Sequence, residues 1–596
     1  MQTLGGGKQL MLTNAKAKLK GSALLSLLLI MVTVTACNDN NSGSTASNAN
    51  SSPKTSASDN ATANASTSES KAATTPNGPT GKYDPPIELT TVRSVNSAAE
   101  LPPGDSLDSN IWVKTFKDEL GINLKNLWKV NDAQYQNKIA VTMASGDMPD
   151  FMEVDAQQFQ ILVEAGTIAD LTDSYAKYAS DLTKGSMEVN NGLRLKAATM
   201  NGKLMGIPVD GGDITDTELI YIRKDWLANV GLQPPKTMED VINIALAFTK
   251  NDPDKNGKND TYGLSLDLNL FNGWSGLDGF FNGYHAYPFN PTKGSATTLN
   301  FMKGPDGKVQ WADTQPEVKT ALGKLADLFK QGAIYPEFSV IDGMKSAELV
   351  TSGKVGMTFG AFWVPTWPIN NMYKDVPGAD WGIYPLVSSD DKPALSQSMT
   401  GLPSRFYVVS KKAEHPEAPI LLLNTYIEKL YGHFDKNYHT VTVDGKDFGV
   451  FGLSPVRGGM PGNNPKAAAA VQAAKQSGDT SALNDEQKQY YDQVAKFEAG
   501  DKSMWAANKL WAADGVFSLL GQYSDNNLVF QSAYVGNPTT TMIAKCPSLR
   551  DEEVKMITSI IMGSKPLDYF DEWAANWLKS GGQDILDEVN ASGQVR

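Results

Sequence analysis

A short apolar segment near the N-terminus indicates in which cellular compartment this chain folds. Residues 23–37 read ALLSLLLIMVTVTAC, and the residues before them include four lysines but no acidic side chain. A basic start, a short apolar run and small residues at its end are typical of a secretory signal peptide. The run is too short for a membrane span, which takes about 20 residues. The sequence therefore predicts that residues 1–36 are a signal peptide and that the rest of the chain folds outside the cell.

The end of this segment, Val34-Thr-Ala-Cys37, resembles a bacterial lipobox. The resemblance implies that Cys37 becomes the first residue after cleavage and carries a lipid; the alternative is an ordinary signal peptide that contains a cysteine. Residues 38–80 are mostly Asn, Ser, Thr, Ala and Gly, without an aromatic residue. Such a segment buries too little apolar surface to fold. We therefore expect residues 37–83 to be a lipidated, disordered tether on the extracellular face of the cell membrane, with the lipid as the only membrane attachment.

Charge and cysteine content argue against several classes of function. A formal net charge of −13 argues against a nucleic-acid partner, because phosphate contacts require basic patches. The only cysteines are Cys37 and Cys546, so no disulfide is expected once Cys37 is lipidated. The four histidines include no His-x-x-x-His pair, which argues against a zinc site. No phosphate-binding loop or serine-hydrolase elbow stands out in the sequence.

From residue 82 onward, strand-like and helix-like segments alternate. Residues 87–92 (IELTTV) are typical of a strand, and residues 132–143 are amphipathic in the manner of a helix. This alternation favours an α/β fold with parallel strands. Thr237-Met-Glu-Asp240 has the pattern of a capping box at the start of a helix. Residues 466–492 are polar and rich in alanine, which predicts an inserted pair of surface helices.

Eight short blocks occur in order along residues 84–596. They are Gly146–Asp150, Glu164–Leu171, Gly206–Pro208, Tyr221–Trp226, Gly231–Thr237, Gly353–Met357 with Trp363, His415–Ala418 and Tyr534–Thr539. Each block is weak alone, but together they resemble the extracellular solute-binding proteins of carbohydrate transport, especially lipoproteins of Gram-positive oligosaccharide ABC importers. Alginate-oligosaccharide-binding proteins are the more similar branch, and maltose-binding protein is a distant relative.

This resemblance implies an α/β, two-lobed periplasmic-binding-protein-like fold of type II, with a hinge and a ligand cleft between the lobes. Ligands of α/β sheets lie beyond the carboxyl ends of the strands. The first lobe is expected to hold residues 84–212 and 395–456, the second residues 213–394 and 457–596, and the hinge residues 208–218 and 388–400. The implied function is that of a receptor, not an enzyme, which captures an oligosaccharide and delivers it to ABC transporter permease subunits. A monomer is the default expectation.

A loop that follows a predicted helix has the spacing of a calcium-binding EF-hand loop. Side-chain oxygens fall at loop positions 1, 3, 5 and 9, and the glycine at position 6 permits a sharp turn. Position 7 would contribute its backbone carbonyl. The expected Ca²⁺ ligands are Asp252, Asp254, Asn256, Lys258 and Asp260. Position 12 is Gly263 instead of the usual glutamate, so we expect a structural ion of modest affinity; the alternative is a solvated turn.

A sugar site needs aromatic platforms for C–H faces and polar side chains for hydroxyl groups. The family resemblance places a sugar-stacking tryptophan at Trp363, and Trp367 belongs to the same aromatic cluster. Trp274 lies in a glycine-containing polar loop, and Asp155 and Gln157 loosely match a segment that contacts sugar in maltose-binding relatives. The expected ligand-binding residues are Trp274, Trp363, Trp367, Tyr534, Asp155, Gln157, Asp210 and Arg223.

Two other functions stay open at the level of the sequence. A secreted glycoside hydrolase needs two carboxylates about 5–10 Å apart across its cleft, a separation that sequence alone does not give. The same fold could instead bind a peptide or act as a co-receptor for a sensor kinase. Turnover of a sugar polymer would indicate the enzyme, and tight binding without a product would indicate the receptor. The identity, length and charge of the sugar do not follow from the sequence.

Overall fold

The computed structural model describes residues 75–95, 100–188, 192–209, 214–271, 273–288, 299–376, 378–397, 403–536 and 538–596. The signal peptide, Cys37, most of the expected tether and Asp210 lie outside these ranges. The described residues belong to one compact unit with two hydrophobic cores. One core draws its buried residues from 83–209 and 406–456, and the other from 219–394 and 467–589. We call the parts around these cores the N-terminal lobe and the C-terminal lobe.

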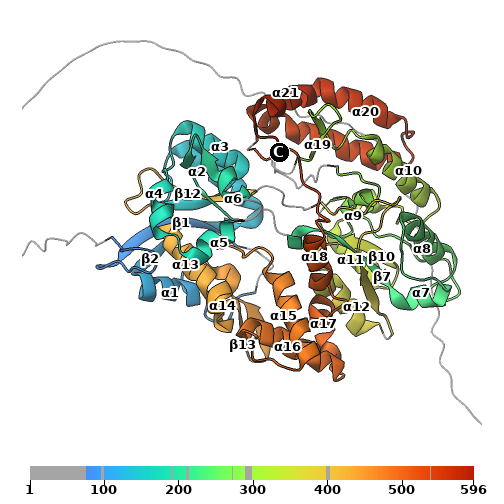
Figure 1. Cartoon of the computed structure of the whole chain (residues 1–596), viewed down its shortest axis with the longest axis horizontal. Coiled ribbons are helices and arrows are strands. Elements are labelled where there is room, and N and C mark those ends of the chain that lie inside the picture. Colours follow the sequence, from blue (N-terminus) through green and yellow to red (C-terminus); the bar gives the residue numbers. More distant parts are fainter. Residues whose placement is uncertain are drawn as a thin grey trace, which may run out of the picture. The chain divides into compact units, whose positions relative to one another are not determined.

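The N-terminal lobe contains a parallel pair, β1 (Ile87–Val95) with β2 (Ile122–Asn131), and an antiparallel sheet in the order β3 (Phe151–Asp155), β12 (Arg405–Val409), β6 (Ile207–Pro208). Figure 1 shows α13, drawn in orange, among the blue and cyan elements of this lobe, so the chain returns to it late in the sequence. The other elements are α1 (Ile111–Leu120), α2 (Asp132–Ser145), α3 (Ala156–Ala165), α4 (Thr172–Tyr178), α5 (Asp181–Met187), α6 (Leu193–Ala198), β4 (Thr199–Met200), β5 (Lys203–Leu204), α13 (Ala418–Ile427), α14 (Lys436–His439), β13 (Thr440–Val443) and β14 (Lys446–Gly449).

The C-terminal lobe is organised around an antiparallel sheet in the order β10 (Met357–Gly360), β7 (Leu219–Arg223), β11 (Trp381–Tyr384). All five residues of the central strand β7 are buried. In Figure 1 the red helix α19 packs beside α10, and α20 and α21 in turn pack against α19. The other elements are α7 (Lys224–Val230), α8 (Met238–Lys250), α9 (Asp278–Asn282), β8 (Phe301–Lys303), β9 (Val309–Trp311), α10 (Pro316–Lys330), α11 (Gly343–Thr351), α12 (Asn370–Asp375), α15 (Asn463–Ser477), α16 (Asp485–Glu498), α17 (Trp505–Trp511), α18 (Val516–Asp525), α19 (Thr540–Ile561), α20 (Tyr569–Trp577) and α21 (Gln583–Ala591).

Local sequence explains where several of these helices start. The expected capping box at α8 is present: the Thr237 hydroxyl accepts from the Asp240 N–H at 3.1 Å, and the Asp240 carboxylate accepts from the Thr237 N–H at 2.9 Å. The expected pair of surface helices is also present as α15 and α16. The second of them starts with a capping box at Asn484. Side chains that satisfy the free N–H groups of the first turn therefore fix the starts of α8 and α16.

The expectation of parallel strands is only partly correct. β1 and β2 pair in parallel, but β12 runs antiparallel to β3, with Arg405 opposite Asp155. The reason is the route of the chain. After passing through the C-terminal lobe, the chain re-enters the N-terminal lobe beside Asp155, at the carboxyl end of β3. Strand β12 starts there and therefore runs in the direction opposite to β3. The result is a mixed α/β fold.

The first described residues are fixed to the N-terminal lobe through helix α13 and the turn before it. The Tyr83 hydroxyl donates to the Glu417 carboxylate at 2.6 Å, and both side chains are buried. The side-chain amide of Asn424, on α13, donates to the carbonyl of Pro79 at 3.1 Å. The chain that precedes β1 therefore enters the protein through contacts with one lobe.

Two further expectations concern the membrane and the cysteines. Among the described residues, no helix has the length and apolar character needed to cross a membrane. Cys546 lies on α19, is buried and has a free thiol. Burial raises the pKa of this thiol from 9.0 to about 12, so the thiolate that would react as a nucleophile is disfavoured.

Candidate ligand-binding site

A cluster of three tryptophans lies at the end of strand β10. The ring centroids of Trp363 and Trp367 are 6.0 Å apart, and those of Trp367 and Trp274 are 5.7 Å apart with the rings at 61°. Trp363 and Trp367 are half-buried, whereas Trp274 is only 2% exposed. The structure thus brings together three of the expected sugar-binding residues. Two of them keep part of their rings accessible, and the third supports Trp367 from inside the lobe.

The buried position of Trp274 results from its backbone and side-chain contacts. Its indole N–H donates to the Ser346 hydroxyl at 2.8 Å, and its backbone forms a bridge with Gly360 at the end of β10. A Cβ atom at Gly360 would lie 2.9 Å from the carbonyl oxygen of Gly273. Glycine at this position therefore lets the loop that carries Trp274 approach the strand, and the loop in turn holds the tryptophan in the core.

Asp155 and Gln157 lie at the carboxyl end of β3, where helix α3 begins. The Asp155 carboxylate accepts from the Gln158 N–H at 2.8 Å and forms a capping box with that residue. Burial raises the pKa of Asp155 above its ordinary value. The Gln157 side chain is partly exposed beside it. Asp155 thus has a clear role at the helix N-terminus, while Gln157 is the more available of the two for a ligand.

Two arginines that the sequence analysis did not select lie near the same end of β3. Arg405 donates to the Glu153 carboxylate at 3.1 Å, and a guanidinium nitrogen of Arg457 lies 3.9 Å from its other oxygen. The side chains of Arg405 and Arg457 are 39% and 42% exposed. These arginines are 252 and 304 residues away from Glu153 along the chain. No local sequence motif therefore predicts that they contact Glu153. Antiparallel pairing of β12 with β3 places Arg405 there.

Arg223 and Tyr534 lie inside the C-terminal lobe. The Arg223 guanidinium donates to both carboxylate oxygens of Asp225, at 2.8 and 2.5 Å, and lies over the Trp226 ring at 4.7 Å. Tyr534 packs edge-on against Phe301, and burial raises the pKa of its hydroxyl to about 12. Both side chains are less than 10% exposed. Their contacts account for structural roles, and a ligand would reach them only after local rearrangement.

The oxygen side chains of the expected calcium loop converge. Asp252 accepts at 3.0 Å from the backbone N–H groups of Asn256 and Gly257, one on each carboxylate oxygen. The Asn256 amide donates to Asp254 at 2.8 Å and to Asp260 at 3.1 Å. Gly257 adopts φ +77°, in the left-handed region that favours glycine. The turn that the spacing predicts is therefore formed.

The electrostatics of this loop show which oxygens could accept a cation. One carboxylate oxygen of Asp254 is buried without a hydrogen-bond partner among the described residues, and burial raises the pKa of this carboxyl, with a smaller contribution from Asp252. Asp260 is paired with the ammonium group of Lys354, which lowers its pKa. Position 12 cannot carry a side chain, because a Cβ at Gly263 would lie 2.1 Å from the carbonyl of Ala245.

The donor set fits a hard cation such as Ca²⁺, which prefers carboxylate, amide and carbonyl oxygens. No cluster of three or more His, Cys, Asp and Glu side chains within the described residues is arranged to hold a metal ion by itself. A calcium ion at this loop would therefore rely also on the Asn256 amide and on the Lys258 carbonyl, the ligands that the spacing assigns to positions 5 and 7.

Two fully buried carboxyl groups, Glu218 and Asp278, lie next to the expected hinge. Glu218 immediately precedes β7 and accepts from the Gly279 N–H at 2.8 Å, while Asp278 accepts from the side-chain amide of Gln397. Burial raises the pKa of Glu218 from 4.5 to about 7 and that of Asp278 well above its ordinary value. Neither side chain is exposed at all, so this pair does not offer the open carboxylate arrangement of a glycosidase.

Comparison with known proteins agrees with this fold. Residues 98–430 match the family of bacterial extracellular solute-binding proteins. The chain belongs to this family. Among curated proteins, it is 24% identical to lipoprotein LipO of Bacillus subtilis over 82% of this chain and 90% of LipO. It is 30% identical to the polygalacturonan/rhamnogalacturonan-binding protein YtcQ of the same organism, over 44% of this chain and 47% of YtcQ.

Solved structures of solute-binding proteins share the two-lobed fold. The alginate-binding protein AlgQ2, in a structure without calcium ion, aligns with a TM-score of 0.56 at 17% identity, over 85% of this chain and 98% of AlgQ2. The substrate-binding protein FusA of S. pneumoniae, as an EF-hand mutant in complex with fructo-nystose, aligns with a TM-score of 0.57 at 16% identity, over 85% of this chain and 98% of FusA. The expected family and the expected fold class are thereby confirmed, and the family consists of binding proteins of ABC importers.

Proposed function

We propose that this protein is a lipid-anchored receptor that binds an oligosaccharide between its lobes and delivers it to the permease of an ABC transporter. The observation that carries the sugar assignment is the pair of half-buried tryptophans, Trp363 and Trp367, backed by the buried Trp274. Accessible aromatic rings at a site held by a rigid core provide the apolar platform that a sugar ring needs. The relatives support the ligand class, since FusA is named for fructooligosaccharide, YtcQ for polygalacturonan and rhamnogalacturonan, and AlgQ2 for alginate.

The proposed receptor works by closure of its lobes. In this proposal the first lobe comprises residues 84–212 and 395–456, and the second comprises residues 213–394 and 457–596. Gln157 and Arg405 supply polar groups from the first lobe, and Arg457, at the boundary between the lobes, approaches them through Glu153. The tryptophan pair supplies the platform of the second lobe. A ligand that contacts both lobes shifts the population toward the closed form, because it binds that form better. The closed form is the one that a permease would recognise.

A calcium ion at residues 252–260 is part of the proposal as a structural ion. The unpartnered Asp254 oxygen and the Asn256 amide oxygen would be among its ligands, with Asp252, Asp260 and the Lys258 carbonyl. When bound, the ion would rigidify this loop. The nearby Lys354 ammonium offsets part of the negative charge, which favours an affinity in the range of extracellular calcium modules, about 10⁻⁴–10⁻³ M.

A ligand screen tests the receptor assignment. The protein is purified without residues 1–37, and its thermal unfolding is followed with fructooligosaccharides, oligogalacturonates and alginate oligosaccharides. A ligand at 100 times its Kd adds about 2.7 kcal/mol to the free energy of unfolding. Stabilisation by one sugar class with no product formed supports the receptor. Stabilisation only by peptides, or release of shorter sugars, would contradict it.

The lipid anchor is tested separately in the native host. Full-length protein should fractionate with the membrane, and the Cys37→Ser variant should be released into the medium or retain its signal peptide. Metabolic labelling with a fatty-acid analogue gives a direct readout of the modification. Unchanged fractionation together with equal labelling of the variant would rule out Cys37 as the lipidated residue.

A further inference from the structure

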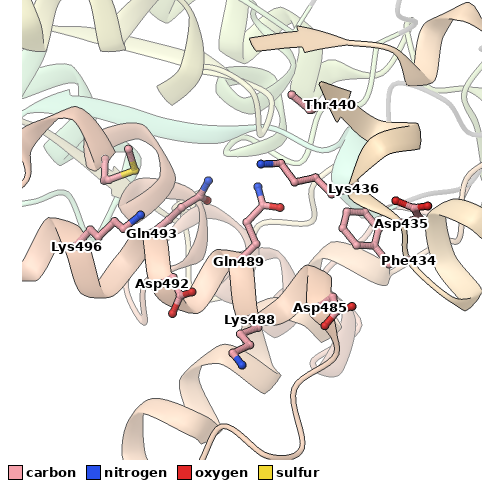
Figure 2. Close-up of a pocket in the computed structure, with 11 residues that line it drawn as sticks. Phe434, Asp435, Lys436, Thr440, Asp485, Lys488, Gln489, Asp492, Gln493 and Lys496 are labelled. Carbon is pink, nitrogen blue, oxygen red and sulfur yellow. The ribbon is translucent and has the colours of Figure 1, made fainter. Parts of the chain in front are cut away.

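A polar hollow of about 670 Å³ lies between the segment 434–440 and helix α16 (Figure 2). Its lining includes three lysines and three aspartates, Lys436, Lys488, Lys496, Asp435, Asp485 and Asp492. Because these charges balance, the hollow favours neither an anion nor a cation. The tryptophan cluster is not part of this lining. A more specific arrangement of polar groups lies behind that cluster, inside the C-terminal lobe.

The ring of Trp367 is not held by a regular helix. The φ and ψ angles of this residue are −152° and 133°, which are extended values within the helical turn Pro365–Ile369. Its backbone N–H donates to the Trp363 carbonyl at 3.2 Å, and this bond connects the two half-buried tryptophans. The direction of the Trp367 ring therefore depends on the side chains against which it packs.

Trp274 is the buried support of that ring. The two rings meet at 61° with centroids 5.7 Å apart, which is the edge-to-face arrangement that aromatic pairs prefer. The Trp367 ring in turn lies at 35° to that of Trp363. A rotation of the Trp274 indole would therefore change the surface on which Trp367 rests, and with it the angle between the two accessible rings.

The orientation of the Trp274 indole is fixed by Ser346, in the first turn of helix α11. The indole N–H donates to the Ser346 hydroxyl at 2.8 Å, and the serine is only 1% exposed. An indole N–H can only donate, so the serine oxygen accepts and its own proton must go elsewhere. Two acceptors are in reach of that proton, the Gly343 carbonyl at 3.0 Å and the Asp267 carboxylate at 3.3 Å.

Further buried polar groups hold Ser346 from behind. Asp267 is not exposed at all, and its other carboxylate oxygen accepts from the Asn269 N–H at 2.8 Å. The Ser275 hydroxyl lies 3.4 Å from that of Ser346 and 2.6 Å from that of Ser265. Several partners thus determine where the Ser346 oxygen lies, and through it they determine the position of the indole.

We propose that Ser346 is a positioning residue of the sugar site: through the Trp274 indole it sets the tilt of Trp367, and thereby the affinity for an oligosaccharide. The inference rests on the proposed function. A sugar ring stacks on the face of an aromatic ring, so its binding depends on how that face is oriented. Removal of the serine hydroxyl takes away an acceptor of a buried N–H group, which then gains free energy by moving toward another partner.

A first measurement needs no ligand. Near-ultraviolet circular dichroism depends on the angles between neighbouring tryptophan rings, so Ser346→Ala should change the tryptophan bands of the chain without residues 1–37. Ser186→Ala is the matched control. Ser186 is buried in the other lobe and donates to the carbonyl three residues earlier, that of Thr183, at 2.7 Å, as Ser346 does to Gly343. The control should leave the tryptophan bands unchanged.

A second measurement uses calorimetric titration with kestose, trigalacturonate and an alginate trisaccharide, and continues with the probe that the unaltered protein binds. Ser346→Ala should weaken its binding about threefold to tenfold, the range that corresponds to an aromatic pair contact. Ser186→Ala should leave the affinity unchanged. In a Trp367→Ala background, Ser346→Ala should have almost no further effect, because its influence passes through that ring. Thermal unfolding verifies that each variant folds.

Ser346→Cys separates positioning from packing, because it keeps the size of the side chain and a weaker acceptor. Its affinity should lie between those of the unaltered protein and Ser346→Ala, and an affinity below that of Ser346→Ala would overturn the inference. Unchanged bands and affinity in Ser346→Ala, or an equal loss of affinity in the Trp367→Ala background, would overturn it as well. Failure of all three probes to bind would instead contradict the proposed function, and the dichroism comparison would still decide whether Ser346 orients the cluster.

Discussion

The ammonium group of Lys354 lies 2.5 Å from a carboxylate oxygen of Asp260, the acidic residue at the end of the 252–260 loop. Lys354 is the lysine of the Gly353–Met357 block and reaches this loop across 94 residues of sequence. A calcium ion with Asp260 among its ligands must therefore compete with the Lys354 ammonium group for this carboxylate. We expect Lys354→Met to increase the affinity for Ca²⁺ severalfold, measured by calorimetric titration. An unchanged or lower affinity would mean that Asp260 is not a calcium ligand.

A calcium site in the 252–260 loop should also affect the thermal stability of the protein. Millimolar Ca²⁺ should raise the unfolding temperature, since an ion that binds only the folded state stabilises it in proportion to ln(1 + [Ca²⁺]/Kd). Asp254→Asn should abolish most of that shift, because it neutralises the carboxylate whose buried oxygen has no partner. Asp306→Asn is the matched control, since Asp306 also caps a surface turn, at Lys308, and the calcium shift should survive it. A chelator without effect on the unaltered protein would contradict a calcium site.

Trp363 is predicted to contribute to ligand affinity more than to stability. Its ring is half-buried at the surface of the cluster, so Trp363→Ala removes a stacking platform while the core around Trp274 stays packed. We expect binding of the preferred oligosaccharide to weaken about tenfold or more, which corresponds to ~1.4 kcal/mol, as measured by calorimetry. Trp128→Ala is the control, because Trp128 is half-buried on β2 and packs against Tyr135. A larger loss of affinity in the control would contradict the assignment.

The raised pKa of Glu218 leads us to expect a specific dependence of the free energy of unfolding on pH. Its pKa is raised to about 7 in the folded state from 4.5, so between these values the folded protein binds more protons than the unfolded chain. The free energy of unfolding must therefore fall as pH rises through this interval and become insensitive to Glu218 above it. Glu218→Gln should flatten that part of the decline, measured by urea unfolding at about pH 4.5, 5.5, 6.5 and 7.5.

The control for this pH effect is Glu88→Gln, because Glu88 is 58% exposed and pairs with Lys125 at the surface. The control should leave the slope between pH 4.5 and 7 as it is. A Glu218→Gln variant with the unaltered slope would show that this carboxyl is ionised in the folded protein, which would refute the assigned pKa.

Gly356 is predicted to be intolerant of any side chain. A Cβ atom there would lie 2.4 Å from the ring of Phe248 and 2.5 Å from that of Trp226, which pack edge to face. Gly356→Ala should cost about 1–3 kcal/mol of unfolding free energy through overpacking, measured by urea unfolding. Gly452→Ala should stay within about 0.5 kcal/mol, because a Cβ atom at Gly452 would have no other atom within 4 Å. Equal stability of the two variants would contradict this packing.

Features that depend on neighbouring residues could be predicted from the sequence. The capping box at Thr237 and Asp240, the turn at Gly257 and the helix pair α15–α16 each arise from interactions within a few residues. The two-lobed fold followed from short blocks whose order is that of the family. Trp363 belongs to one such block and Trp367 to the aromatic cluster around it, and the partial exposure of both is compatible with their choice as ligand-binding residues.

Features that depend on long-range packing could not be predicted. Trp274 sits in a glycine-containing loop that suggests exposure, yet close approach to Gly360 draws it into the core. Arg405 and Arg457 reach Glu153 only because β12 pairs antiparallel with β3 after the chain has passed through the other lobe. Lys436 and α16 line one hollow although 49 residues separate Lys436 from the start of the helix. Such neighbours are set by topology, which no local pattern encodes.

The attachment of residues 79 and 83 to the N-terminal lobe has a mechanical consequence. The bonds from Tyr83 to Glu417 and from Asn424 to Pro79 transmit any tension along the preceding chain into that lobe. Both bonds end on residues of the N-terminal lobe. In the proposed receptor, a pull on the chain before residue 79 would therefore act on the N-terminal lobe, and closure would be movement of the C-terminal lobe relative to it.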